Sequence, residues 1–424
     1  MTAGKIRRVP KEAVVRPLDP DRMRRADRWI GVPACFLLTI WSRLFGRRRG
    51  VTAQNSNVLF IELAEMGTTV IACPAIRRLQ EIRPGAKVFF LLLKQIEASI
   101  RVLDVVPDAH VLTIDASSPW TVLRDTVRFM RDARRLGIDT VINLEAFTRF
   151  TAMIGYLSGA ATRVGFHRFH QEGLYTGDLF THRVQYNPHL HTWQSLTVLV
   201  NALDARADEL PVGKFPAPPA DGYVVPRIRH PELQPRLREL LGPANAPSSD
   251  RRLIVINPNA SKLISIRKWP LERYAELAAR LLDDPRHACV LTGVASELDD
   301  AEFIRQRVQS DRLVILTGKT SLAELIELYN MADVLVTNDS GPAHFAALTD
   351  IDVVVFFGPE TPTLYGPMTR RASVLYSDYA CSPCVSAFNQ RRSPCTNNRC
   401  LQAISVESVH RTVLEVLEGR QPRT

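Results

Sequence analysis

Short apolar runs alternate with segments of helical spacing along most of the chain. The first four runs predict strands at residues 57–62, 87–93, 109–114 and 140–144. Between them, apolar residues recur every three or four positions, as at Leu123, Val127 and Met130, which is the period of a helix with one buried face. Strands that alternate with helices predict a parallel sheet covered on both faces.

A second run of the same kind follows a proline-rich stretch. Residues 211–250 hold nine of the 28 prolines, and such density interrupts regular structure. Further strands are predicted at 253–257, 288–292, 313–316, 334–337 and 353–357, with a helix at 269–283. The pattern predicts an α/β protein with two Rossmann-like domains, 51–210 and 251–424, joined by a linker region at 211–250. A cleft should lie between them, at the carboxyl ends of both sets of strands.

Composition and charge narrow the class of protein. The 424 residues are too many for one compact core, and 46% of them are hydrophobic, as in ordinary globular proteins. The sequence has no stretch of roughly 20 apolar residues free of charge, which argues against a polytopic membrane protein. The net charge is +10, but residues 1–50 hold 13 Lys and Arg against four acids, so the rest of the chain is nearly neutral. That distribution argues against a nucleic-acid partner, which would need a basic folded surface.

Residues 1–50 predict a segment that binds the membrane surface. An apolar run from Trp29 to Phe45 lies between basic clusters and ends before Arg47, Arg48 and Arg49. The run begins late for a secretory signal and is short for a span, whereas Trp and Arg at its edges suit the headgroup boundary. Basic clusters are attracted to anionic lipid by roughly 1 kcal/mol per residue. The alternative is a basic tail followed by a helix that packs on the body.

One motif has the form of an anion-binding turn. Asn338-Asp-Ser-Gly-Pro-Ala-His344 directly follows a predicted strand and opens a helix. Pro342 suits a first helical position, and the free amides of a helix start can bind phosphate. Taken alone the signal is weak, because many α/β proteins begin helices in this way.

This motif belongs to a longer set that resembles glycosyltransferase family 9, the heptosyltransferases of lipopolysaccharide core synthesis. The further matching segments are Leu316–Leu325, Phe357–Pro367, Asn257–Ser261, Arg267–Pro270, Glu65–Gly67, Cys73–Leu79 and Arg163–Phe166. The resemblance covers about residues 57–418. It implies a GT-B type fold, an inverting transfer from a nucleotide sugar, and no metal or other cofactor requirement.

The resemblance also implies a set of donor-binding residues. The amides around Ser340, Gly341, Pro342 and His344 are candidates to hold the donor diphosphate, with Asp339 orienting the turn. Arg267 or Lys268 matches the basic position that contacts donor phosphates, and Ser261 lies nearby. Glu297 matches an acid near the nucleotide ribose. The alternative for each is a structural role: His344 can pack against the preceding loop, and the basic pair can be a solvated helix start.

The catalytic base is not identified by the resemblance. Family members carry Asp directly after the Met-Gly pair, whereas this chain has Thr68, which cannot act as a base in place of a carboxylate. Glu65 shares the same loop and is the first candidate, and Glu62 nearer the strand is the second. Both can instead be structural.

Four cysteines gather near the carboxyl terminus. Cys381, Cys384, Cys395 and Cys400 are compatible with a structural zinc site, although the second spacing is loose. Two disulfides would need an oxidising compartment, and free thiols are the third interpretation. The site prediction includes no metal.

Together these features predict a peripheral glycosyltransferase at the cytoplasmic face of the inner membrane. Its expected partners are a nucleotide sugar, with ADP-heptose as the first candidate, a lipopolysaccharide core or other lipid-linked glycan acceptor, and an anionic membrane surface. Two alternatives remain open: another nucleotide-sugar donor, or a degenerate relative that binds nucleotide sugar or glycan without turnover.

Overall fold

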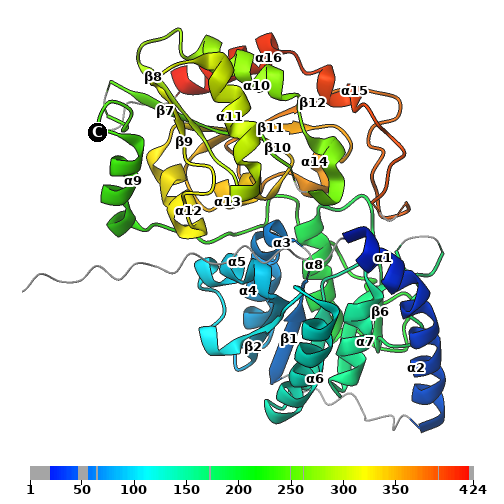
Figure 1. Cartoon of the computed structure of the whole chain (residues 1–424). Helices are drawn as coiled ribbons and strands as arrows, with labels where there is room; N and C mark the ends of the chain where they lie inside the picture. Colours follow the sequence, from blue (N-terminus) through cyan, green and yellow to red (C-terminus); the bar gives the residue numbers. More distant parts are fainter. Residues whose placement is uncertain are drawn as a thin grey trace, which may run out of the picture.

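The computed structural model describes residues 20–45, 56–63, 65–170, 173–248, 250–260, 262–389 and 391–419. Two sheet-and-helix units lie one above the other, with the amino-terminal unit below in Figure 1. Each contains a six-stranded sheet in which every strand pairing is parallel.

The first sheet has the strand order β3-β2-β1-β4-β5-β6. Its strands are β1 (Asn57–Ile61), β2 (Lys87–Leu93), β3 (Val111–Ile114), β4 (Thr140–Asn143), β5 (Thr162–His167) and β6 (His182–Gln185). Its helices are α3 (Met66–Ile71), α4 (Cys73–Ile82), α5 (Glu97–Leu103), α6 (Pro119–Arg135), α7 (Arg149–Leu157) and α8 (Thr192–Asn201). The order reverses between β1 and β4, and ligands of such sheets bind at this switch point.

The second sheet repeats the same topology, with the order β12-β11-β10-β7-β8-β9. Its strands are β7 (Arg252–Asn257), β8 (His287–Leu291), β9 (Leu313–Ile315), β10 (Val334–Asn338), β11 (Asp352–Phe357) and β12 (Ala372–Tyr376). Its helices are α10 (Leu271–Leu281), α11 (Leu298–Val308), α12 (Leu322–Met331), α13 (Gly341–Ala346), α14 (Pro362–Tyr365), α15 (Arg399–Gln402) and α16 (Val406–Glu418). The switch point here lies between β7 and β10.

In the ranges that the structure describes, the nine strands predicted from apolar runs are present, and three further strands carry no such run. Strand β12 has half-buried side chains at the edge of its sheet, and β5 is interrupted by Gly165. That glycine is needed for packing, because a Cβ there would lie 2.5 Å from the Phe180 ring. Edge position and close packing both remove the hydrophobic signature of a central strand.

The proline-rich stretch includes a helix, α9 (Gln234–Leu241), with Pro235 in its first turn. Leu237 and Leu241 are buried, and α9 lies against α12 of the second unit. Part of the stretch expected to be linker therefore packs as regular structure, which proline permits at the first helical positions. The division of the chain at 210 and 250 remains a prediction.

Two helices precede the first sheet, α1 (Pro20–Trp29) and α2 (Gly31–Phe45). Both lie along the amino-terminal unit, with α2 beside α7 (Figure 1). The helix expected in this segment therefore packs on the body, while residues 1–19 and 46–55 lie outside the described ranges. Among the residues that the structure describes, none of the helices is long and apolar enough to cross a membrane.

Candidate active site

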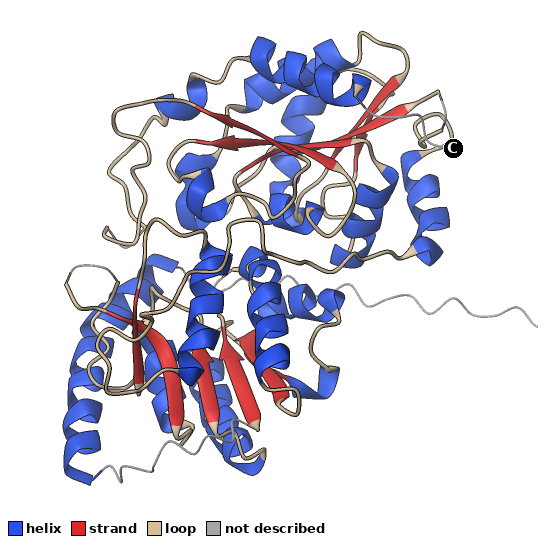
Figure 2. Ribbon diagram, turned by 180° about the vertical axis from the view of Figure 1, so that it is seen from behind, coloured by secondary structure: helices blue, strands red, loops and turns tan. Residues whose placement is uncertain are grey.

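Both switch points deliver polar side chains to the boundary between the two units. In the ribbon view of Figure 2, the boundary lies above the first sheet and below the second. Glu62 directly follows β1, and Glu145 follows β4, whose Asn143 pairs in register with Ile61. Asn259 follows β7, and Asp339 follows β10.

Glu62 and Glu145 form a buried carboxyl pair. Both side chains are less than a tenth exposed, and a hydrogen bond joins them. Burial raises the pKa of Glu62 well above its ordinary value, and the neighbouring charge of Glu145 raises it further. A carboxyl group that holds its proton in this way can donate to its neighbour but is not available as a base. Glu62, the second candidate for the catalytic base, is therefore held in a buried carboxyl pair that does not favour proton acceptance.

The loop after β1 packs against the second unit. Met66 and Gly67 open α3, and a Cβ at Gly67 would lie 2.6 Å from Cδ2 of His344 on α13. A glycine is required here because the imidazole occupies the space of a side chain. The Met-Gly pair and the Asn338–His344 motif, both found in the sequence, thus meet face to face.

Glu65 lies two residues before this glycine, directly before Met66, and joins a cluster of charged side chains from both units. Arg391 forms an ion pair with Glu65 and a bidentate one with Glu360, with Nε 2.9 Å from Oε1 and Nη2 3.2 Å from Oε2. Arg267 Nη1 lies 3.3 Å from Oδ2 of Asp339 and 3.5 Å from Oε2 of Glu360. Two guanidinium groups therefore neutralise most of the charge of three carboxylates.

The cluster gives two of its carboxylates, Glu65 and Glu360, different pKa values. Burial alone would raise the pKa of Glu65, but Arg391 and Arg267 outweigh it and lower the pKa. Burial raises the pKa of Glu360 to about 7 against the opposing effect of the same arginines. Glu65 is also the more accessible group, with 29% of its side-chain surface exposed against 1% for Glu360. It is the ionised, reachable carboxylate of the cluster.

Within the described part of the chain, three buried nitrogen atoms near the ends of β7 and β10 have no hydrogen-bond partner: Arg267 Nε and His344 Nδ1 in this cluster, and Asn259 Nδ2 after β7. Burial lowers the pKa of His344 to about 4, so its ring is neutral near pH 7. Buried polar groups are nearly always paired, and each unpaired one costs roughly 1–3 kcal/mol. Convergent unpaired groups beside two arginines are typical of a site that receives an anionic ligand.

Local structure fixes the donor-side residues. Asn338 Oδ1 accepts from the backbone N–H of Trp269 at 2.9 Å, and its Nδ2 donates to the carbonyl of Asn259 at 3.2 Å. The Trp269 ring is fully buried, which anchors the segment that carries Arg267. Asn338 thus ties the ends of β7 and β10 to this arginine.

The structure brings some of the predicted residues together and leaves others apart. Arg267, Asp339, His344 and Glu65 belong to the cluster. Lys268 does not, because its Nζ lies 2.5 Å from Oδ2 of Asp300 on α11.

The remaining predicted donor residues lie near the ends of β8 and β10. Glu297 accepts from the N–H of Val294 at 2.9 Å, beside Gly293. Ser340 is buried at the start of α13, followed by Gly341 and Pro342. That helix has only six residues, so its dipole is smaller than the motif suggested. Ser261 lies outside the described residues.

Arg391 was not found by sequence reasoning. It belongs to the loop between β12 and α15, where the cysteines were the only feature noted. The loop is pinned beside Glu360: the N–H groups of Cys384 and Val385 donate to the Pro359 carbonyl at 3.0 and 2.9 Å. Arg391 itself has φ +56°, a conformation that costs non-glycine residues energy and clusters at functional sites. The sequence signal that could have indicated a functional role for Arg391 was an arginine among turn residues between cysteines.

Cys381, Cys384 and Cys395 of this loop, and Cys400 in α15, have free thiols in the structure. Cys400 is buried, and its Sγ would lie 2.8 Å from a Cβ at Gly358. Ser393 Oγ donates to Cys384 Sγ at 3.1 Å. The described residues contain no group of three or more His, Cys, Asp or Glu side chains arranged for a metal ion.

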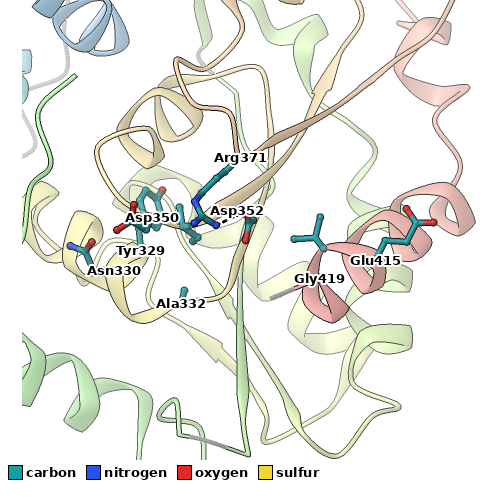
Figure 3. Close-up of a pocket in the computed structure, with 10 residues that line it drawn as sticks. Tyr329, Asn330, Ala332, Asp350, Asp352, Arg371, Glu415 and Gly419 are labelled. Atoms are coloured by element: carbon teal, nitrogen blue, oxygen red, sulfur yellow. Dashed lines mark hydrogen bonds and ion pairs between the residues drawn. The ribbon is translucent and has the colours of Figure 1, made fainter. Parts of the chain in front are cut away.

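A hollow of about 620 Å³ opens at the opposite edge of the second sheet. Figure 3 shows Tyr329, Asp352 and Arg371 among its lining residues. These residues precede or flank the amino ends of β10, β11 and β12, and Arg371 is ion-paired with Asp352 at 3.4 Å. The hollow is therefore remote from the cluster and is not the site described above.

The two parallel sheets, with polar groups from both switch points at their boundary, define the GT-B class of glycosyltransferase fold. The model of "Glycosyltransferase family 9 (heptosyltransferase)" matches residues 126–393, more than half of the chain. The chain belongs to this family, as its motifs indicated.

Individual relatives are more distant. Lipooligosaccharide heptosyltransferase 2 of Campylobacter jejuni (serotype O:2) is 26% identical over 163 residues, which cover 38% of this chain and 49% of that protein. Lipopolysaccharide heptosyltransferase 2 of Escherichia coli K12 is 31% identical over 131 residues, 30% of this chain and 37% of that protein. The chain thus spans about half or less of the length of these curated relatives.

Solved structures match over more of the chain. E. coli ADP-heptose lps heptosyltransferase II superposes with a TM-score of 0.65 at 18% identity, covering 85% of this chain and 98% of that one. A family 9 glycosyltransferase from Veillonella parvula gives a TM-score of 0.67 at 17% identity, covering 86% and 98%. These likenesses show the fold.

The buried carboxyl pair leads to a pH-dependent prediction. Because the pKa of Glu62 is raised in the folded state, its stabilising contribution is complete below its ordinary value of 4.5 and is lost as pH rises through the folded-state pKa. The Gln at this position in Glu62→Gln cannot titrate, so the free energy of unfolding of this variant should rise relative to that of the parent as pH increases above 4.5. Urea unfolding at several pH values measures this difference.

Glu65→Gln is the matched control, because the pKa of Glu65 is lowered. Its contribution is present above 4.5 and lost as pH falls, so this variant should be destabilised near neutral pH and approach the parent in acid. Parallel pH curves for the two variants would contradict the assigned environments.

Proposed function

We propose that this protein is an inverting glycosyltransferase that moves a sugar from a nucleotide sugar to a lipid-linked glycan. ADP-heptose is the donor that we favour, and a lipopolysaccharide core the acceptor, at the cytoplasmic face of the inner membrane. Family membership supports the class of reaction. The observation that carries the proposal is the buried cluster of two arginines and three unpaired nitrogen atoms at the junction of the two units.

The donor diphosphate is assigned to Arg267, Arg391 and the nitrogen atoms around them. A leaving nucleoside diphosphate develops negative charge as the bond from the anomeric carbon to its phosphate oxygen breaks. Arg267 Nε, Asn259 Nδ2 and His344 can each offer a hydrogen bond to it without first releasing a protein partner. With positive charge supplied by side chains, the proposed reaction needs no metal.

The acceptor side requires a base. As the acceptor oxygen attacks the anomeric carbon, its proton must pass to a side chain, and Glu65 is the accessible ionised carboxylate of the cluster. Its ion pair with Arg391 lowers its pKa and weakens it as a base. A bound diphosphate would attract Arg391 and so raise the pKa of Glu65 toward its ordinary value. Donor binding and base activation would then be coupled through one guanidinium group.

A second function remains in view because of Thr68. In a protein that lacks the family's usual aspartate, the same cluster could bind a nucleotide sugar or glycan without turnover. The ion-paired state of Glu65 favours that alternative over a different enzymatic reaction. Turnover separates the two functions.

The proposed activity is tested with purified full-length protein, ADP-heptose and lipid-linked core acceptors. We expect release of ADP that depends on acceptor, and an acceptor product heavier by one heptose in mass spectrometry. Other nucleotide sugars serve as donor controls. Saturable donor binding without product on any acceptor would contradict transfer and support the binding function.

Arg267→Ala should weaken ADP binding by about 1.5–3 kcal/mol, the range for a hydrogen bond to a charged group. Lys268→Ala is the matched control, because Lys268 is the adjacent cation but pairs with Asp300 outside the cluster. Isothermal titration with ADP measures both, and thermal unfolding monitors folding, since Arg267 is buried among carboxylates. Equal effects of the two substitutions would remove Arg267 from the donor site.

Glu65→Gln should lower the transfer rate by roughly 10²–10⁴-fold, the contribution of a general base. The amide keeps the shape and removes the basicity, so ADP affinity should stay within a few-fold of the parent. Glu62→Gln should transfer at nearly the parental rate, because burial and Glu145 raise the pKa of Glu62 and make it a poor candidate to act as the ionised base. A Glu65→Gln enzyme that turns over like the parent would assign the proton to another group.

A further inference from the structure

Helix α2 carries its small residues toward the protein and its large apolar residues outward. Gly31, Cys35 and Thr39, one helical turn apart, are the buried positions. The opposite face repeats at the same spacing and is apolar. Its large exposed side chains are Phe36, Leu37, Ile40, Trp41 and Leu44. A surface helix normally presents the reverse pattern, with apolar residues inward.

The inner face of α2 is held firmly. Cys35 packs with Ala152, Leu179 and Phe180 in a small buried cluster. Thr39 Oγ1 accepts from the N–H of Asp178 at 3.0 Å, and close approach at this point depends on Gly177, where a Cβ would lie 2.0 Å from Thr39 Oγ1. The helix is therefore docked on the folded body.

Helix α1 is fixed by an ion pair of its own. Asp27 Oδ2 lies 2.8 Å from Nη1 of Arg149, and both side chains are largely buried. Asp27 Oδ1 also accepts from the backbone N–H of Arg149 at 2.8 Å, at the start of α7. An aspartate at that position caps the helix as well as pairing with the arginine. The two helices, which are separated only by Ile30, thus form one rigid element, which we name the α1–α2 element.

The outer face of the α1–α2 element is too apolar to be an ordinary solvated surface. Leu37 is 63% exposed, Trp41 57% and Leu44 69%, and Trp29 and Ile30 at the junction of the two helices are also exposed. Contiguous exposed apolar patches mark interaction sites. At 15 residues, α2 is about 22 Å long, which is shorter than a bilayer core.

We propose that this outer face is the membrane-contacting surface of the protein and that its occupant is the interface of an anionic bilayer. Charge complementarity supports lipid over a second copy of the chain, because residues 1–50 carry 13 basic residues against four acids. A segment of this composition would repel an identical one and attract anionic headgroups. A row of large apolar side chains that includes Trp41, with Trp29 exposed at the end of α1, is typical of helices that lie in the interface.

The α1–α2 element also lies close to the candidate active site. Asp27 holds the amino end of α7, which directly follows the loop containing Glu145 and Phe147. The Phe147 ring lies 5.8 Å from the guanidinium of Arg391. Figure 1 shows α1 at the level where the two units meet and α2 running away from it. A bilayer under the outer face would therefore lie beside the mouth of the candidate active site, where a lipid-linked acceptor arrives. In this respect the inference rests on the proposed function.

The test uses the full-length chain with vesicles of phosphatidylcholine, with and without phosphatidylglycerol. Leu37→Ser combined with Trp41→Ser should weaken vesicle binding by about tenfold or more, since two large side chains lose burial. Trp120→Ser combined with Leu123→Ser is the matched control, because these α6 residues are 70% and 56% exposed. All the changed side chains are exposed, so thermal unfolding should hardly move. Co-sedimentation measures binding without any sugar transfer.

The inference is supported if the parent and the α6 variant bind phosphatidylglycerol vesicles alike while the α2 variant does not. Equal binding by all three, or equal loss in both variants, would overturn it. A parent that binds no vesicles would also overturn it, and light scattering would then separate a dimer formed through this face from a monomer that covers it. Because no turnover is measured, failed transfer with intact vesicle binding would reject the proposed function and leave this inference standing.

Discussion

The candidate site depends on keeping two buried guanidinium groups charged between three carboxylates. Arg391 and Arg267 come from different segments of the second unit, yet both contact Glu360, and Arg391 reaches across to Glu65 of the first. Each ion lost from such a cluster would leave its partner uncompensated in a poorly solvated place. The loop after β1 and the loop before α15 are therefore constrained to meet, and the position of the two units follows from that contact together with the packing of Gly67 on His344.

A single loop supports both arginines. The segment between β12 and α15 carries Arg391, and Asn398 near its end donates to the carbonyls of Ile266 and Lys268 at 2.9 and 2.8 Å, on either side of Arg267. The loop is in turn bonded to the backbone at Pro359. The cysteine-bearing segment is thus a scaffold for the charged groups, whatever the chemistry of its thiols.

The sequence was sufficient for the architecture and for four residues of the cluster: Glu65, Arg267, Asp339 and His344. Central strands are continuous apolar runs, and the Met-Gly and Asn338–His344 motifs lie at strand ends, so both could be placed in advance. Arg391 could not, because its role depends on a turn that brings it next to Glu65, 326 positions earlier. From the sequence alone, Arg267 and the adjacent Lys268 were equally good candidates to bind the donor phosphates. The structure distinguishes them, because Lys268 pairs with Asp300 outside the cluster. The raised pKa of Glu62 likewise depends on burial and on Glu145, which the register of β1 with β4 brings beside it.

The docking of α2 has a geometric consequence for acceptor choice. A flexible tether would allow the cleft to sample many distances from the lipid surface, whereas α1 and α2, held to the body by Asp27 and Thr39, allow one. On a bilayer, the reacting carboxylate would then stand at a set height above the headgroups. Glycans built on a lipid grow outward one sugar at a time, so such a fixed height would act as a ruler, selecting an acceptor by its length before any side chain reads its structure.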